Sequence, residues 1–140
     1  MKKLLTPIGF WLVSLTWGSI MTLVGAFAAL ALLIAGHKPK LYKHYVWFEV
    51  GENWGGVNLG GFIITSKNST ESTIKHEAGH GIQNLIFGPF QVFIGVASAI
   101  RYHYYMYNRK KGTEHLLPPY DSIWFENQAT KFGEKYFSAN

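Results

Sequence analysis

The 140-residue chain contains no cysteine and few acidic residues. The lack of cysteine excludes disulfide bridges, thiol catalysis and cysteine-ligated zinc sites. Aspartate and glutamate number eight against thirteen lysines and arginines, which gives a formal net charge of +5. The basic residues are scattered, and their two small clusters flank apolar segments, where lysines commonly face lipid head groups. The charge therefore predicts a lipid bilayer as partner and no nucleic acid.

Charged residues are also missing from residues 4–36, which are mostly aliphatic and aromatic. A membrane span needs about 20 apolar residues, so this segment is long enough. We expect residues 1–37 to hold an N-terminal transmembrane helix, which makes the chain an integral protein of the bacterial inner membrane. The alternative is a secretory signal peptide with a cleavage site at Ala26-Phe27-Ala28, although its apolar part would be unusually long.

The lysines beside this segment bear on its orientation. Lys38, Lys40 and Lys43 follow it, and Lys2 and Lys3 precede it. Because positive charge concentrates in cytoplasmic loops, the excess of one lysine favours a cytoplasmic C-terminal part.

Residues 38–140 are expected to form one small α+β domain, with a short β-hairpin or sheet, an active-site helix and C-terminal helices. Residues 41–50 and 57–65 are rich in aromatic and branched side chains and are predicted to be strands that pair as a hairpin. Gly60 and Gly61 in the second strand indicate a bulge, a close approach of another backbone, or simply the twisted edge of a small sheet. A domain of about a hundred residues has a modest hydrophobic core, so we expect it to pack against the membrane helix or the bilayer.

Three helices are predicted after the strands. The first begins at an N-cap formed by Asn68 and ends at Phe87, before Gly88-Pro89. The segment 90–107 is first uncharged and then aromatic and basic, which is compatible with a re-entrant, an interfacial, a spanning or a buried helix. The last helix is predicted to begin at a cap formed by Asp121 or Ser122.

The first of these helices carries His76-Glu77-x-x-His80. Residues four apart lie on one face of a helix, so the two imidazoles point to one place, as a tetrahedral zinc site requires. Glu77 is rotated away from them and is predicted to be the catalytic general base that takes a proton from the attacking water. The motif predicts a zinc metallopeptidase that hydrolyses peptide bonds in a peptide or protein substrate.

A third zinc ligand must come from elsewhere in the chain. Glu126 is preferred because it lies on a predicted helix beside Trp124 and Phe125. A carboxylate among apolar residues usually has a partner. His103 and His115 are the alternatives.

The same residues resemble those of a known family. The motif with Gln83, followed by Gly88-Pro89, is similar to small bacterial membrane-associated proteins that carry HExGHxxQ and then GP. With the later Glu126-x-x-Ala129, it also resembles the gluzincin branch of zinc metallopeptidases. The resemblance implies zinc bound by His76, His80 and Glu126, with a substrate strand along residues 57–65.

Other candidates surround this group. Gluzincins commonly place an aspartate where Thr130 stands, and a hydroxyl there can still accept a hydrogen bond from a ligand histidine. Gln83 is a candidate to hold the second nitrogen of a ligand or a substrate carbonyl, with an amide on the helix surface as the alternative, and Asn58 is a further candidate in the substrate strand. Five tyrosines are candidates for oxyanion stabilisation, namely Tyr102, Tyr104, Tyr105, Tyr107 and Tyr120.

Two other functions compete with the peptidase. In the first, the chain is a non-catalytic membrane protein whose metal site holds a small domain together. In the second, it is an interaction module whose HExxH is accidental, which predicts that Glu126 lies far from His76. A homo-oligomer that completes the substrate cleft is left open.

Overall fold

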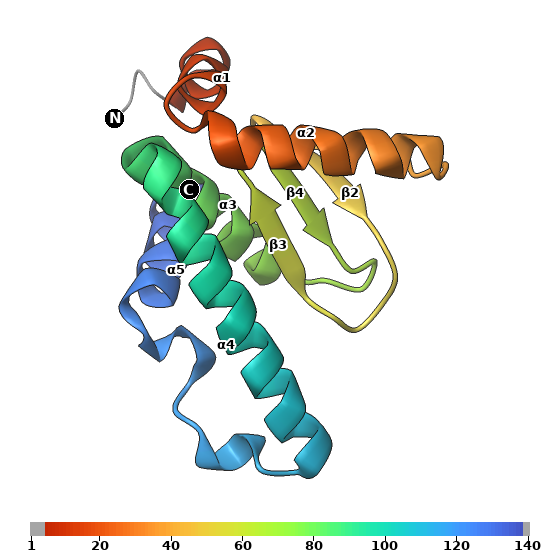
Figure 1. Cartoon of the computed structure of the whole chain (residues 1–140), viewed down its shortest axis with the longest axis vertical. Coiled ribbons are helices and arrows are strands. Elements are labelled where there is room, and N and C mark those ends of the chain that lie inside the picture. Colours follow the sequence, from red (N-terminus) through yellow and green to blue (C-terminus); the bar gives the residue numbers. More distant parts are fainter. Residues whose placement is uncertain (1–4, 139–140) are drawn as a thin grey trace.

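The computed structural model of the protein describes residues 5–138, so Lys2, Lys3 and the start of the expected membrane segment lie outside the described residues. The described part contains one four-stranded sheet and five α-helices, which confirms the α+β class. The helices are α1 (Pro7–Leu15), α2 (Ser19–Ile34), α3 (Glu71–Phe87), α4 (Gln91–Lys111) and α5 (Trp124–Phe137). Figure 1 shows α2 across the upper end of the sheet, α4 beside the sheet, and α5 farther from the sheet, to the left of α4.

The sheet differs from the expected hairpin. Its strands are β1 (Lys40–Tyr42), β2 (Tyr45–Glu49), β3 (Gly56–Leu59) and β4 (Phe62–Thr65), in the order β1-β2-β4-β3. Each of the two expected strands is itself a tight hairpin, and β2 pairs with β4 in parallel. The predicted hairpin between residues 41–50 and 57–65 is therefore wrong.

Backbone conformation explains this difference. Lys43 turns the chain between β1 and β2 with φ 55°, and Gly60 does so between β3 and β4 with φ 69°. Two-residue hairpin turns need such positive φ values. Glycine adopts them without strain, so a turn at Gly60 can be anticipated, whereas lysine rarely adopts them and its presence at position 43 does not indicate a turn. The loop between β2 and β3 then carries the chain to the far side of β4, which leaves β3 at the edge of the sheet.

The apolar N-terminal segment is bent rather than straight. Helices α1 and α2 meet at an angle of 99°, whereas one continuous helix was expected. The side chain of Asn84 in α3 donates a hydrogen bond to the carbonyl oxygen of Gly18, 3.2 Å away, at this bend. A contact between distant residues therefore fixes a corner that apolar composition does not reveal.

Helix α2 covers the sheet with one face only. Its buried residues are Met21, Thr22, Gly25 and Ala29, and large apolar side chains on the opposite face are exposed. By length and composition, α1 and α2 taken as one bent span are apolar enough to cross a membrane, and so is the run Glu71–Lys111 that joins α3 to α4.

The central helix α3 ends at Phe87, as predicted, but begins at another residue. Thr70 is its N-cap and accepts a hydrogen bond from the backbone N–H of Thr73. Asn68, the expected cap, instead accepts a hydrogen bond from the backbone N–H of Asn53. Helix α5 likewise begins at Trp124 with Ile123 as its N-cap, one residue after the nearer of its expected caps, because residues 120–122 form a separate 3₁₀ turn.

Helices α3 and α5 pack at very short distance. A Cβ atom at Gly79 would overlap the carbonyl group of Ala129, and one at Gly133 would overlap that of Lys75. Both glycines lie inside helices, where they cost conformational entropy. Close contact between the two backbones accounts for their presence, and it sets the position of α5 relative to the HExxH motif.

We predict that Gly79→Ala lowers the free energy of unfolding. The added methyl group has no space between α3 and α5, and overpacking of this kind costs about 1–3 kcal/mol. Gly95→Ala is the matched control, since its Cβ would lie 3.3 Å from the flexible end of Met21. Denaturant unfolding in detergent should show a loss for Gly79→Ala alone, and equal stabilities of the two variants would contradict the packing described here.

Candidate metal centre

Three helices contribute to one buried cluster of polar side chains. Helix α3 supplies His76 and His80, α5 supplies Glu126, and α4 supplies Ser98. The two histidines lie one helical turn apart, and their ring centroids are 4.8 Å from each other. Glu126 is fully buried, with 0% of its surface exposed. An ionised carboxylate in such a place requires positive partners.

The distances in the cluster suit a metal ion. Oε2 of Glu126 lies 2.9 Å from Nε2 of His76 and 3.1 Å from Nε2 of His80. The three ligand atoms all lie within 4.8 Å of one another, so the group can hold a metal. For zinc bonds of 2.0–2.1 Å, tetrahedral ligand atoms stand about 3.3 Å apart. The two separations that involve Oε2 of Glu126, 2.9 and 3.1 Å, are within a few tenths of an ångström of that value.

Gln83 fixes the protonation of one histidine. Its amide nitrogen donates to the carbonyl oxygen of Phe125 at 2.7 Å, so its amide oxygen must face Nδ1 of His80, also 2.7 Å away. An amide oxygen only accepts hydrogen bonds, and Nδ1 of His80 must therefore carry the proton. In the neutral ring, the lone pair on Nε2 then points towards Glu126.

Thr130 holds the other histidine. Its hydroxyl oxygen lies 2.9 Å from Nδ1 of His76 and can accept the ring N–H. This is the arrangement expected for Thr130 from the sequence, with a neutral hydroxyl where a carboxylate would be more strongly basic. Each imidazole is thus fixed by a hydrogen bond at Nδ1, and its Nε2 faces Oε2 of Glu126.

The converging atoms require a cation between them. Two imidazole lone pairs and a carboxylate oxygen are all acceptors, so either protons or a metal ion must join them. Burial alone would raise the pKa of Glu126, but hydrogen bonds from His76 and His80 hold it below its usual range. Burial alone would lower the pKa of His80, but its hydrogen bond to Glu126 raises it above its ordinary value. The pocket favours positive charge at this point.

Two contributors were not found from the sequence. Ser98 donates a hydrogen bond to the second oxygen of Glu126, and Gln91 donates one to the carbonyl oxygen of His80 at 3.4 Å. Both lie in the uncharged segment that begins α4. Isolated polar residues in an apolar helix were the available signal, but only the position of α5 shows what Ser98 bonds.

Glu77 lies beside the cluster without belonging to the group of three. It is buried under β3, where a Cβ at Gly56 would stand 3.0 Å from Cγ of Glu77. Burial raises the pKa of Glu77, although the two histidines and a hydrogen bond from the backbone of Asn58 act in the opposite direction. The carboxyl group is therefore held between the histidines and the edge of the sheet.

A cavity of about 340 Å³ reaches this point. Its lining includes β3 on one side, α4 on the other, and His76, Glu77 and His80 between them. The expected substrate strand, residues 57–65, is thus only partly at the site, because the chain turns at Gly60 and β4 lies inside the sheet. The side chain of Asn58 bonds to the backbone of Gly60, and only its main chain lies beside Glu77.

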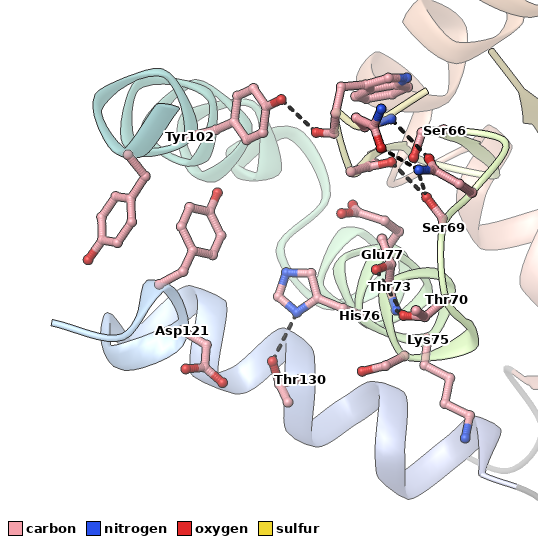
Figure 2. A pocket seen from close by; sticks show the side chains of 18 of the residues that line it. Ser66, Ser69, Thr70, Thr73, Lys75, His76, Glu77, Tyr102, Asp121 and Thr130 are labelled. Atoms are coloured by element: carbon pink, nitrogen blue, oxygen red, sulfur yellow. Dashed lines mark hydrogen bonds between the residues drawn. The ribbon is translucent and has the colours of Figure 1, made fainter. Parts of the chain in front are cut away.

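A larger and more polar cavity, of about 1000 Å³, adjoins the first. Figure 2 shows His76 and Glu77 at its wall, with Tyr102 on α4 and Thr130 on α5 around it. His76 and Glu77 line both cavities, so the cluster stands where the two meet.

The positions of the five candidate tyrosines show which of them can reach the cavities. Tyr102 and Tyr120 line both cavities, whereas Tyr104 and Tyr107 are more than half exposed. Burial raises the pKa of Tyr120 to about 12, so its hydroxyl stays protonated and can donate a hydrogen bond. Tyr105 is buried and donates to the carbonyl oxygen of Pro118 at 2.6 Å.

The alternative third ligands are not in the cluster. Within residues 5–138, the group that can hold a metal consists of His76, His80 and Glu126 and includes neither His103 nor His115. His103 lines the smaller cavity, and His115 is exposed in a 3₁₀ turn. The contact of Glu126 with His76 also contradicts the separation that an accidental motif predicts.

Comparison of the chain with protein-family models, with curated proteins and with solved structures gives no match. The function is therefore inferred from the geometry of the site.

We predict that Gln83→Met weakens metal binding about 10- to 100-fold, as loss of an outer hydrogen bond to a ligand histidine typically does. Gln128→Met is the matched control, because it removes the bond between Gln83 and Gln128 but leaves the one to His80. Competitive zinc titration of the two purified variants measures the difference. Equal affinities would show that Gln83 does not orient His80.

Proposed function

We propose that the protein is a membrane-attached zinc metallopeptidase, with His76, His80 and Glu126 as zinc ligands and Glu77 as the catalytic base. The observation that carries this proposal is the convergence of two imidazole nitrogens and one carboxylate oxygen beside Glu77, at the wall of an open cavity. Such a site can bind an ion and still admit a substrate.

The choice of zinc follows from the donor set. Two imidazoles and one carboxylate suit zinc, whereas magnesium and calcium prefer oxygen ligands. His76 and His80 line the smaller cavity, so a fourth position on a bound ion would be accessible from it. Three protein ligands with an open position are typical of catalytic zinc sites.

Zinc bound there would activate a water molecule and polarise the scissile carbonyl. Glu77 would take the proton of the attacking water and later deliver it to the leaving amine. Its position between the histidines and β3 suits both transfers, since the scissile bond would lie in the cavity that Glu77 lines. Tyr120 lines the same cavity, and its protonated hydroxyl, which donates to the carbonyl oxygen of Ser98 at 3.4 Å, would turn from that bond to stabilise the developing oxyanion.

The free edge of a strand would bind the substrate chain. Among residues 5–138, strand β3 pairs with β4 alone, so its other edge, where the backbone of Asn58 donates to Glu77, borders the cavity that Glu77 lines. An extended peptide can add to such an edge through main-chain hydrogen bonds. This mode of binding would lay the peptide bond across His76 and His80.

Attachment to a membrane would occur through α1 and α2. Within the described residues these helices carry no charge, and their outward side chains are strongly exposed, including Ile8, Leu12 and Phe27. Exposed apolar surface on this scale is typical of membrane or protein contact. We keep the bacterial inner membrane as the location and the cytoplasmic side for the catalytic part, which the excess of one lysine favours.

A structural metal site is the second candidate, and one observation favours it. The cluster joins α3 to α5, and a metal there would hold these two helices together. A purely structural site, however, normally has four protein ligands, and this group has three beside an open cavity.

We predict that Glu77→Gln retains zinc but cleaves peptides about 10²- to 10⁴-fold more slowly, because the amide cannot take a proton. Zinc content and cleavage of a fluorogenic peptide library by the reconstituted protein measure the two properties. Glu52→Gln is the control, since this carboxylate is exposed and lines neither cavity. Undiminished cleavage by Glu77→Gln would refute the proposed mechanism.

A further inference from the structure

The smaller cavity lies between two elements that also present apolar surface to the outside. Met21 of α2 and Gly95 and Ala99 of α4 line it, opposite β3. Met21 reaches Gly95 closely, so α2 and α4 meet at one end of this cavity. In Figure 1, α2 extends sideways from this meeting point and α4 extends downwards.

The outer sides of both helices are apolar. On α2, Leu23 and Phe27 are 54% and 74% exposed, and on α4, Phe93, Val96 and Ile100 are 72%, 55% and 65% exposed. Helix α2 and the first ten residues of α4 contain no charged residue. Apolar area of this size rarely faces water in a soluble monomer.

Charge at the far tips of the two helices indicates what covers this surface. Helix α2 is followed by Lys38, and α4 ends in Arg109, Lys110 and Lys111. Lys38, Lys110 and Lys111, which lie beyond the two ends of the uncharged surface, complement the anionic head groups of a bilayer, whereas Arg109 is paired with Glu114. On α4, the exposed large side chains are aliphatic or phenylalanine up to Ile100 and tyrosines from Tyr104 onwards. Tyrosine is enriched at the membrane interface.

Two exposed residues that line the smaller cavity, Ala99 and His103, lie at this change. Ala99 is exposed and adjoins Ile100, and His103 lies one turn further along α4 on the cavity side. If α2 and the first half of α4 rest in the outer part of one leaflet, Ala99 and His103 stand at the depth of the lipid head groups. A polypeptide would then enter beside the bilayer.

We propose that the smaller cavity opens onto the bilayer surface and that the substrates are segments of membrane proteins where they leave the lipid. The substrate class rests on the proposed peptidase function, whereas the position of the cavity does not. A segment of this kind is already held near the opening, so its effective concentration at β3 greatly exceeds that of a free peptide.

The position of the cavity can be tested by fluorescence, because the chain has no cysteine of its own. Ala99→Cys carries an environment-sensitive fluorophore, and the full chain is reconstituted in vesicles of phosphatidylethanolamine and phosphatidylglycerol with spin-labelled lipids. The matched control is Lys67→Cys, at an exposed residue that lines neither cavity. Strong quenching at residue 99 and weak quenching at residue 67 are expected, and equal quenching at the two positions overturns the proposal.

The substrate class can be tested by capture rather than turnover. A short peptide of leucine and lysine is prepared with and without a palmitoyl chain, and each form is added to vesicles holding the Glu77→Gln protein with a photo-crosslinker at residue 99. Crosslinking of the palmitoylated form is expected to exceed that of the free form by about 10-fold or more. Equal crosslinking of the two forms, or none, overturns the proposal.

Cleavage by the wild-type protein separates this proposal from the proposed function. Selective capture of the palmitoylated peptide without cleavage of either form by zinc-loaded wild type would refute the peptidase and leave the position of the cavity intact. Cleavage of both forms at equal rates, with no selective capture, would support the peptidase and refute the membrane-proximal substrate.

Discussion

Close packing of α3 against α5 is the constraint on which the site depends. At Gly79 and Gly133 each helix meets a backbone carbonyl of the other, with no space for a side chain. This contact brings Glu126 to within hydrogen-bonding distance of His76 and His80, which lie some fifty residues earlier in the chain. The energetic cost of burying that carboxylate is offset only if positive charge lies beside it.

The remaining parts of the site follow from this contact. With α5 in place, Gln83 reaches the backbone of Phe125 and fixes the proton of His80, and Thr130 reaches His76. Helix α4 then lies over Glu126, to which Ser98 donates a hydrogen bond. Since β3 stands on the other side of Glu77, the same arrangement leaves a cavity between a strand edge and a helix.

Local features of the sequence predicted part of this structure. The α+β class, the helix that carries the motif and its end at Phe87 could be predicted, because helical periodicity and Gly88-Pro89 are local signals. The proximity of Glu126 to the histidines could also be anticipated, since a carboxylate among apolar residues needs a partner. The metal itself stays a prediction.

Features that depend on distant contacts could not be predicted in this way. The turn at Lys43 has a positive φ that lysine does not signal, and the parallel pairing of β2 with β4 joins segments separated by β3. The bend between α1 and α2 is held by Asn84, far along the chain. Ser98 acquires its role only through the placement of α5.

The central claim is that His76, His80 and Glu126 bind one metal ion, and metal content tests it most directly. Purified, zinc-supplemented protein should contain one zinc ion per chain, which Glu126→Ala should lose or bind far more weakly and Glu134→Ala should retain. Both carboxylates lie on α5, but only Glu126 belongs to the group. A folded wild-type protein without zinc, or a zinc content indifferent to Glu126, would contradict the account.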